Sequence, residues 1–286
     1  MVEAYRPETL SEALEILAEK SCTIMAGGTD LMVQKARGFA LQPIYDLPLL
    51  FINHLDELQN ITIENNEIHI GAGAVLTDII NSYLIPDTFK EVIGQMASPP
   101  TRNLATIGGN IVNASPAGDT LPYLYAVNAT VELQSAGNNR ILSINEFITA
   151  PKTTILQKNE LLTNIIIPNR EFDFNIYRKL GQRKGMSLTK AAFHGLANIA
   201  DDNITDIRMA LGSVAPRIVR SVEFEKMIIG KSINDIPAMI PLILEKYAEL
   251  IKPIDDARST AKYRKDVSLR MIDSFLRNDL TPGTQR

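Results

Sequence analysis

Two Gly-Gly pairs in similar surroundings constrain this chain more than any other feature of its sequence. The first lies in AGGTD at 26–30 and the second in ATIGGN at 105–110. Because glycine has no Cβ, its backbone N–H groups can approach an anion closely, and a helix that begins after the turn adds partial positive charge. One such pair is most simply a tight turn. Two pairs about 80 residues apart favour one shared diphosphate ligand, so the residues alone predict a nucleotide or dinucleotide site.

Two other glycine motifs do not satisfy the phosphate-binding signatures that they resemble. Gly71-Ala72-Gly73 follows an apolar strand like the start of a dinucleotide-binding fingerprint, but Leu76 occupies the position of the third glycine. Gly230-Lys231-Ser232 resembles the end of a P-loop, but Glu225 stands where that loop needs glycine. A helix C-cap is predicted at Gly230 instead.

The sequence predicts neither a metal site nor a hydrolytic site. The three histidines show no His-x-x-x-His spacing, and the chain has no Gly-x-Ser-x-Gly motif. The one cysteine, Cys22, can form no disulfide within the chain and cannot by itself hold an iron–sulfur cluster, which needs several thiolates. We therefore expect no metal on this chain and a reducing, cytoplasmic setting.

Composition excludes further classes of protein. The chain has 286 residues, of which 45% are hydrophobic and 22% charged, so it is expected to fold into about two domains rather than stay disordered. The net charge of -4 provides no basic surface for nucleic acid or anionic lipid. The beginning of the sequence does not resemble a secretory signal, and no apolar run approaches the roughly 18 residues of a membrane helix.

Hydrophobic spacing and turn residues predict a mixture of helices and strands. Helices are expected at 9–20, 31–38, 87–97 and 119–127, strands at 22–26, 44–46 and 161–167, and hairpins from 61–64 with 67–70 and from 130–134 with 140–143. The polar stretch 168–175 marks a domain boundary. Beyond it, antiparallel strands are expected at 191–199 and 204–211, and helices at 219–229, 234–249 and 259–277.

Three longer motifs occur in the order found in one family: AGGTDLM at 26–32, RNLATIGGNIVNASPAGDTLP at 102–122 and ARSTAKYRKDV at 257–267. With them the chain resembles the FAD-binding subunit of molybdenum hydroxylases, the group that contains xanthine dehydrogenase and carbon monoxide dehydrogenase. Further matches at 159–168, 177–179 and 225–231 extend the resemblance over essentially the whole chain.

The resemblance implies an α+β fold. An FAD-binding domain at 1–170, of the PCMH type and similar to vanillyl-alcohol oxidase, would consist of two subdomains at roughly 1–54 and 55–170. A small α+β domain at 171–286, with a three-stranded antiparallel sheet and helices, would follow it.

The resemblance also implies which residues bind FAD. The two glycine motifs would enclose the diphosphate, Asp119 would accept hydrogen bonds from ribityl or ribose hydroxyls, and Leu162 and Lys179 would lie at the flavin. Met96 occupies a position where some relatives place an aromatic residue beside the ring, and Pro99-Pro100 replaces more usual polar residues. The predicted cofactor-binding residues are Ile24, Met25, Ala26, Gly27, Gly28, Thr29, Asp30, Met96, Ala105, Thr106, Gly108, Gly109, Asn110, Asp119, Leu162 and Lys179.

The function implied is electron transfer within an oxidoreductase complex. Electrons would pass from a molybdopterin-containing large subunit, through a small subunit with [2Fe-2S] clusters, to FAD on this chain and then to NAD+, in a heterotrimer or its dimer. A xanthine or purine dehydrogenase is the predicted complex, and no residue of this chain is predicted to be catalytic. Two alternatives stay open: a stand-alone flavin-dependent reductase or oxidase on the same fold, and a module that has lost its flavin.

Overall fold

The chain passes repeatedly between two units of structure. A computed structural model describes residues 2–38, 41–183 and 185–280. Met1–Ile85, Ala97–Asn113 and Ala129–Asn169 form the first unit, and Pro86–Met96, Ala114–Asn128 and Arg170–Arg286 form the second. The units follow contacts rather than chain order, so the domain boundary predicted at residue 170 stays a prediction.

The first unit begins with a small parallel sheet whose strands are ordered β1-β3-β2: β1 (Ala4–Tyr5), β3 (Leu49–Phe51) and β2 (Thr23–Met25). Helix α1 (Leu10–Glu19) starts at Thr9, whose hydroxyl accepts a hydrogen bond from the backbone N–H of Glu12, as the sequence predicts. Its apolar face packs into the same core cluster as Leu50 of β3. Strand β2 ends directly before the first glycine pair, and the short helix α2 (Leu31–Gln34) follows that pair.

A five-stranded antiparallel sheet forms the rest of the framework of the first unit. Its order is β4 (Ile61–Glu64), β5 (Glu67–Gly71), β10 (Leu161–Pro168), β6 (Thr130–Ser135) and β7 (Asn138–Ser143). Asn65 and Asn66, with φ of 51° and 63°, form the tight turn predicted between the first two strands. The remaining elements are η1 (Asp56–Leu58), α3 (Leu76–Asn81), α5 (Pro99–Arg102), α6 (Ile107–Val112), α8 (Ile144–Phe147), β8 (Ile148–Ala150) and β9 (Thr153–Thr154).

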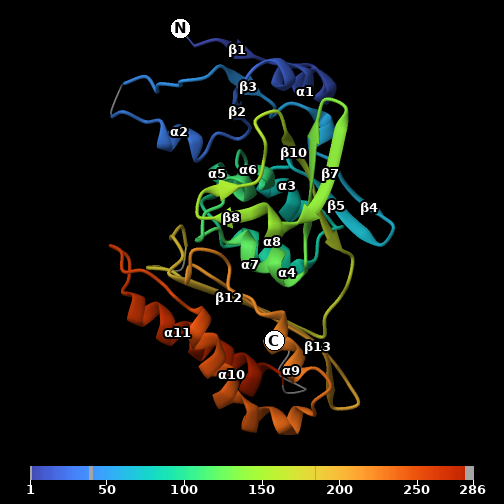
Figure 1. The fold of residues 1–286 in the computed structure, drawn as a ribbon, viewed down its shortest axis with the longest axis vertical. Helices are drawn as coiled ribbons and strands as arrows, with labels where there is room; N and C mark the ends of the chain where they lie inside the picture. Colours follow the sequence, from blue (N-terminus) through green and yellow to red (C-terminus); the bar gives the residue numbers. More distant parts are fainter. Residues whose placement is uncertain (1, 39–40, 184, 281–286) are drawn as a thin grey trace. The chain divides into compact units, whose positions relative to one another are not determined.

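The second unit is a three-stranded antiparallel sheet between two layers of helices (Figure 1). Successive side chains of its middle strand point to opposite faces: His194 contacts Tyr123 of α7, whereas Phe193 contacts Phe275 beyond α11. The strands are β11 (Phe174–Leu180), β12 (Ala191–Ala200) and β13 (Asn203–Gly212). One helical layer consists of α4 (Asp87–Gly94) and α7 (Thr120–Ala126), and the other of α9 (Val222–Ile228), η2 (Ile233–Asp235), α10 (Ile236–Leu250), α11 (Ala261–Ser274) and η3 (Phe275–Asp279).

The α+β class and the three-stranded antiparallel sheet are confirmed, whereas three local predictions are wrong. Residues 44–46 form no strand, and the strand of this region is β3. Strand β11 overlaps the stretch 168–175, which the sequence predicts to be only a boundary. Helix α2 ends at Gln34 instead of continuing to residue 38. None of the helices in the described part of the chain has the length and apolar character needed to cross a membrane.

Candidate functional site

A cavity of about 320 Å³ lies in the first unit, where the two glycine motifs meet. We call residues 26–30 the first glycine segment and residues 105–110 the second. The predicted residues that line the cavity are Ile24, Ala26, Gly27, Gly28, Thr29, Asp30, Ala105, Thr106, Gly108, Gly109, Asn110 and Leu162. The sequence did not indicate the other lining residues, which are Leu31, Gln34, Ile52, Ala72, Val112, Asn113, Leu156 and Leu161.

Met25 is a predicted residue of the first unit that does not line the cavity. It is buried in β2, between Ile24 and Ala26, which both line the cavity. Alternation along a strand turns its side chain to the other face. Ala72, by contrast, lines the cavity although the sequence does not predict it as a site residue. It lies there because its carbonyl oxygen accepts a hydrogen bond from the N–H of Gly108 in the second glycine segment.

The first glycine segment presents free hydrogen-bond donors. The strand pairing that precedes it ends where the N–H of Ile52 donates to the carbonyl oxygen of Met25 at 3.1 Å, and α2 begins where the N–H of Met32 donates to Gly28 at 2.9 Å. Between these bonds, the N–H groups of 27–30 donate to no acceptor among the described residues. Gly28, at φ +69°, turns the backbone here in a way that L side chains rarely allow. Successive free N–H groups at a cavity can bind anion oxygens.

The second glycine segment has its donors already engaged. Thr106 caps α6, because its hydroxyl oxygen accepts from the N–H of Gly109 at 3.1 Å. The neighbouring N–H groups donate to backbone carbonyls: Ile107 to Ala74 at 3.1 Å, Gly108 to Ala72 at 2.9 Å and Asn110 to Thr106 at 3.1 Å. This segment therefore contributes shape and side chains to the cavity more than backbone donors.

The glycines differ in what they make possible. A Cβ on Gly27 would lie 1.8 Å from the carbonyl oxygen of Leu104, so the first segment lies against the backbone that leads into the second. A Cβ on Gly108 would lie 2.6 Å from the Cβ of Ala72. By contrast, a Cβ on Gly109 would meet only the hydroxyl of its own cap, Thr106, at 2.9 Å. Gly27 and Gly108 thus permit close packing, whereas Gly109 leaves room at the cavity.

The three remaining predicted residues belong to the second unit, where they lie near each other. Lys179 on β11 forms an ion pair with Asp119, with Nζ 2.7 Å from Oδ2, and donates to the carbonyl oxygen of Gln95 at 3.0 Å. Met96, which is buried, directly follows Gln95 in the chain and so lies close to this contact. The hydroxyl of Thr189 donates to the other oxygen of Asp119. Because the side chains of Lys179 and Asp119 are only 6% and 11% exposed, water screens this pair weakly.

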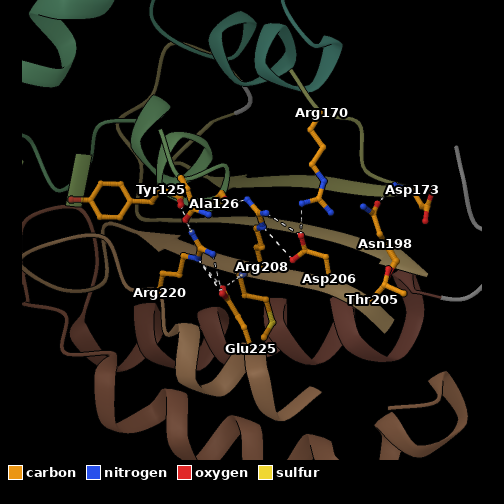
Figure 2. A network of polar contacts seen from close by, with 12 residues as sticks. Tyr125, Ala126, Arg170, Asp173, Asn198, Thr205, Asp206, Arg208, Arg220 and Glu225 are labelled. Atoms are coloured by element: carbon orange, nitrogen blue, oxygen red, sulfur yellow. Dashed lines mark hydrogen bonds and ion pairs between the residues drawn. The ribbon is translucent and has the colours of Figure 1, made fainter. Parts of the chain in front are cut away.

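Helix α7, which begins directly after Asp119, is fixed at its other end by two arginines of the second unit (Figure 2). Arg208 donates to the carbonyl oxygen of Ala126 at 3.1 Å, and Arg220 donates to that of Tyr125. Arg220 is itself paired with Glu225, with Nε 2.9 Å from Oε1. The last carbonyls of a helix have no partner within it, so the guanidinium groups satisfy them and hold the helix in place.

The histidine of this unit serves packing rather than a metal or a ligand cavity. His194 is fully buried, and burial lowers its pKa from 6.5 to about 3, so the ring is neutral at physiological pH. Its Nε2 lies 2.8 Å from Oδ1 of Asn175. Elsewhere in the described residues, no three His, Cys, Asp or Glu side chains gather closely enough to hold a metal ion.

Two family profiles match the chain and together span most of its length. One, described as the FAD binding domain in molybdopterin dehydrogenase, matches residues 1–170, and the other, described as the CO dehydrogenase flavoprotein C-terminal domain, matches residues 176–278. The chain belongs to the FAD-binding medium subunits of molybdenum hydroxylases. It is therefore a subunit of an oxidoreductase.

Relatives of this medium subunit have different substrates in their names. The glyceraldehyde dehydrogenase medium chain of Sulfolobus acidocaldarius is 33% identical over 269 residues, which cover 92% of each chain. The xanthine dehydrogenase FAD-binding subunit of Escherichia coli O157:H7 is 25% identical, over 91% of this chain and 89% of its own. The solved structure of carbon monoxide dehydrogenase from Hydrogenophaga pseudoflava superimposes with a TM-score of 0.86 at 26% identity, over 95% of this chain and 94% of that one.

Proposed function

We propose that the cavity of the first unit binds the diphosphate part of FAD and that the chain relays electrons from [2Fe-2S] clusters on a small subunit to NAD+. A large subunit with a molybdopterin cofactor would complete the complex, as a heterotrimer or its dimer. The support for a flavin role is the match to an FAD-binding domain over residues 1–170. The support for the position is the row of free N–H groups at 27–30 on a cavity wall.

The residues of the cavity fit the diphosphate of FAD. Amide donors that no protein acceptor uses bind phosphate oxygens without the cost of breaking internal hydrogen bonds. The open side of Gly109 leaves room for the ligand, and the apolar side chains of Ile24, Ile52 and Leu161 keep water from that part of the wall. A volume of about 320 Å³ is within the range of ligand sites (~300–1,000 Å³).

The resemblance to the family makes the Asp119–Lys179 pair of the second unit a proposed contact for FAD. Asp119 would accept hydrogen bonds from hydroxyl groups of FAD, and Lys179 would offer a cation to the flavin ring or a phosphate. Leu162 and Met96 would provide apolar contacts. Asp119 and Lys179 hold each other in position at 2.7 Å, so each is oriented before a ligand arrives.

The chemistry that FAD supplies when bound is the conversion between one-electron transfer from iron–sulfur clusters and two-electron transfer to NAD+. The chain itself positions the cofactor and needs no acid or base of its own. A chain whose single cysteine is Cys22 needs clusters from another subunit, which supports a complex with an iron–sulfur partner.

The relatives of this chain belong to complexes that are named for different substrates. Xanthine or a purine stays the predicted substrate, on the resemblance to xanthine dehydrogenase, but relatives are also named for glyceraldehyde and carbon monoxide. In the proposed arrangement the organic substrate binds to the molybdenum subunit. The assembled complex should be assayed with xanthine, glyceraldehyde, nicotinate and carbon monoxide, each with NAD+, oxygen and a quinone as acceptor.

The flavin site can be tested on the purified full-length chain, alone and with its partner subunits. The chain is incubated with FAD or FMN, desalted, and examined for the visible absorption of oxidised flavin, and the released flavin is identified by chromatography. We expect retention of FAD and not FMN, and loss of retention in Gly28→Val and Gly109→Val. Gly94→Ala is a matched control, because a Cβ there meets no atom within 4 Å. Folded protein that retains no FAD even with its partners contradicts the proposal.

A further inference from the structure

Polar side chains from three separate parts of the first unit meet at one side of the cavity. Lys152 Nζ lies 2.5 Å from Oδ1 of Asn113 and 3.7 Å from Oδ2 of Asp30. Gln34 Nε2 donates to the same oxygen of Asp30 and lies 3.4 Å from the same oxygen of Asn113. Asp30, Gln34 and Asn113 all line the cavity. Lys152 thus joins the end of the first glycine segment to the C-cap of α6, the helix that begins within the second segment.

Lys152 is placed for this contact by its backbone. It lies in the turn between β8 and β9 and adopts φ of +59°, which is uncommon for a residue with a side chain. The side chains of Lys152 and Asp30 are each 53% exposed, so the ion pair is open to solvent and weak as a source of stability. The arrangement therefore contributes little to folding.

Asp30 creates an electrostatic problem for an anion at this site. It is the last residue of the first glycine segment and lines the same cavity as the residues with free N–H groups. A negative charge there repels a phosphate that the N–H groups attract. The ammonium group of Lys152 neutralises this carboxylate locally and also contacts Asn113.

We propose that Lys152 is a positioning residue of the diphosphate site, which acts by neutralising the carboxylate of Asp30. The inference rests on the proposed function, since it concerns the same cavity. It assigns Lys152 an indirect role: its ammonium group pairs with protein oxygens and does not bind the phosphate itself.

A double-mutant cycle separates this indirect role from a direct contact with phosphate. The full-length chain and the variants Lys152→Ala, Asp30→Asn and Lys152→Ala/Asp30→Asn are titrated with FAD, and the Kd and the dissociation rate are measured by flavin fluorescence. We expect Lys152→Ala to weaken FAD binding about three- to tenfold, through faster dissociation. In the Asp30→Asn background the same replacement should change Kd by less than about twofold, because no carboxylate is left to neutralise.

Further variants test whether a general loss of positive charge or a loss of the fold explains the effect of Lys152→Ala. Lys158→Ala removes the same charge from an exposed position between β9 and β10 and should leave Kd within about twofold of the parent. Lys152→Arg keeps the charge and should restore most of the affinity. The thermal unfolding temperature of each variant without FAD reports whether the fold is intact. Raising the salt concentration should reduce the difference between the parent and Lys152→Ala.

The outcomes distinguish this inference from the proposed function. If the parent binds FAD and Lys152→Ala binds it equally well, Lys152 has no role in the site and the inference is wrong. An equal loss in both backgrounds means that Lys152 acts without Asp30, through a direct contact with phosphate or through Asn113, and also overturns the inference. If the parent chain binds no FAD with or without its partners, the proposed function fails, and the role of Lys152 fails with it.

Discussion

The two glycine segments have nearly the same composition but are used differently. In the first segment the N–H groups of 27–30 donate to nothing in the described protein, and Gly28 holds a backbone angle of φ +69°. In the second, the N–H groups of 107–110 are all bonded to the protein, and the backbone is an ordinary short helix. Both place one glycine in tight contact with another backbone, which is Gly27 in the first segment and Gly108 in the second.

Under the proposed function, the two segments would serve the ligand in two ways. The free donors of the first would attract it, and the occupied donors of the second would fix a wall whose missing side chains give it space. Gly27 of the first segment lies against the backbone of Leu104, which leads into the second segment. The positions of the two segments are therefore coupled, because neither can shift without moving the other. Substitutions at the four glycines and their threonines should therefore have graded and distinct effects.

The largest effect is expected at Gly27. A Cβ there would lie 1.8 Å from a backbone oxygen, so Gly27→Ala must displace the backbone itself. We expect a loss of more than about 3 kcal/mol in the free energy of unfolding, together with loss of FAD binding. Thermal and urea unfolding followed by circular dichroism measure the first, and Gly94→Ala serves as the control. A Gly27→Ala protein with parental stability would show that the close approach is not needed.

Substitution of Gly28 by alanine should reduce the free energy of unfolding less than Gly27→Ala does, but should weaken FAD binding markedly. Alanine at φ +69° costs about 1–2 kcal/mol, and relaxation of the turn would re-aim the free N–H groups. Gly28→Asn tests the cause, because asparagine tolerates positive φ better than alanine does. We expect weaker FAD binding in Gly28→Ala than in Gly28→Asn, measured by flavin fluorescence. Equal binding by both would mean that the backbone angle does not control the donors.

Gly109 should separate binding from stability most clearly. Its Cβ would meet only the hydroxyl of Thr106, so Gly109→Ala is expected to change the free energy of unfolding by about 1 kcal/mol or less. The methyl group would still enter the ligand space, and we expect FAD affinity to fall about tenfold. The rise in unfolding temperature on addition of FAD should shrink accordingly. If the variant loses stability but binds FAD like the parent, Gly109 is a packing residue like Gly108.

The smallest contrast is expected between the two threonines. Thr106→Ala removes the cap of α6 and should cost about 1 kcal/mol of stability. The side chain of Thr29 caps no helix, so Thr29→Ala should cost less than about 0.5 kcal/mol. Unfolding of the two variants without FAD makes the comparison. A larger loss for Thr29→Ala would contradict the assignment of the structural role to the second segment.

Local signals explain which parts of the fold could be predicted from the sequence. The turn at Asn65-Asn66 and the cap at Thr9 depend on neighbours within a few residues, and both are found as predicted. The strand expected at 44–46 failed because β3 exists through parallel pairing with β1 and β2, whose residues lie far away in the chain. Strand β11 was missed because only Phe174 and Tyr177 of its residues are buried, so it lacks an apolar run.

The candidate site was predictable in composition but not in its hydrogen bonding. Two glycine pairs near polar residues are visible in the sequence, and the structure places both at one cavity. Whether their N–H groups are free depends on residues far away in the chain. The carbonyl oxygens of Ala72 and Ala74, more than 30 residues before the second segment, accept hydrogen bonds from two of its N–H groups. Lys152 gave no signal either, because a lysine in a turn resembles any solvated charge.

The discontinuous units have a consequence for how the protein is made. The first unit has all of its segments once residue 169 has been synthesised, but 86–96 and 114–128 belong to the second unit, which needs strands and helices up to residue 280. At ~5–20 residues per second, the roughly 150–185 residues between those segments and Asp279 take about 8–37 s to synthesise. During that interval the apolar side chains of Phe89 and Tyr123, which stack on each other at 4.3 Å in the finished fold, have no sheet to cover them. The nascent chain is therefore most exposed to aggregation at a stage when the cavity of the first unit can already form.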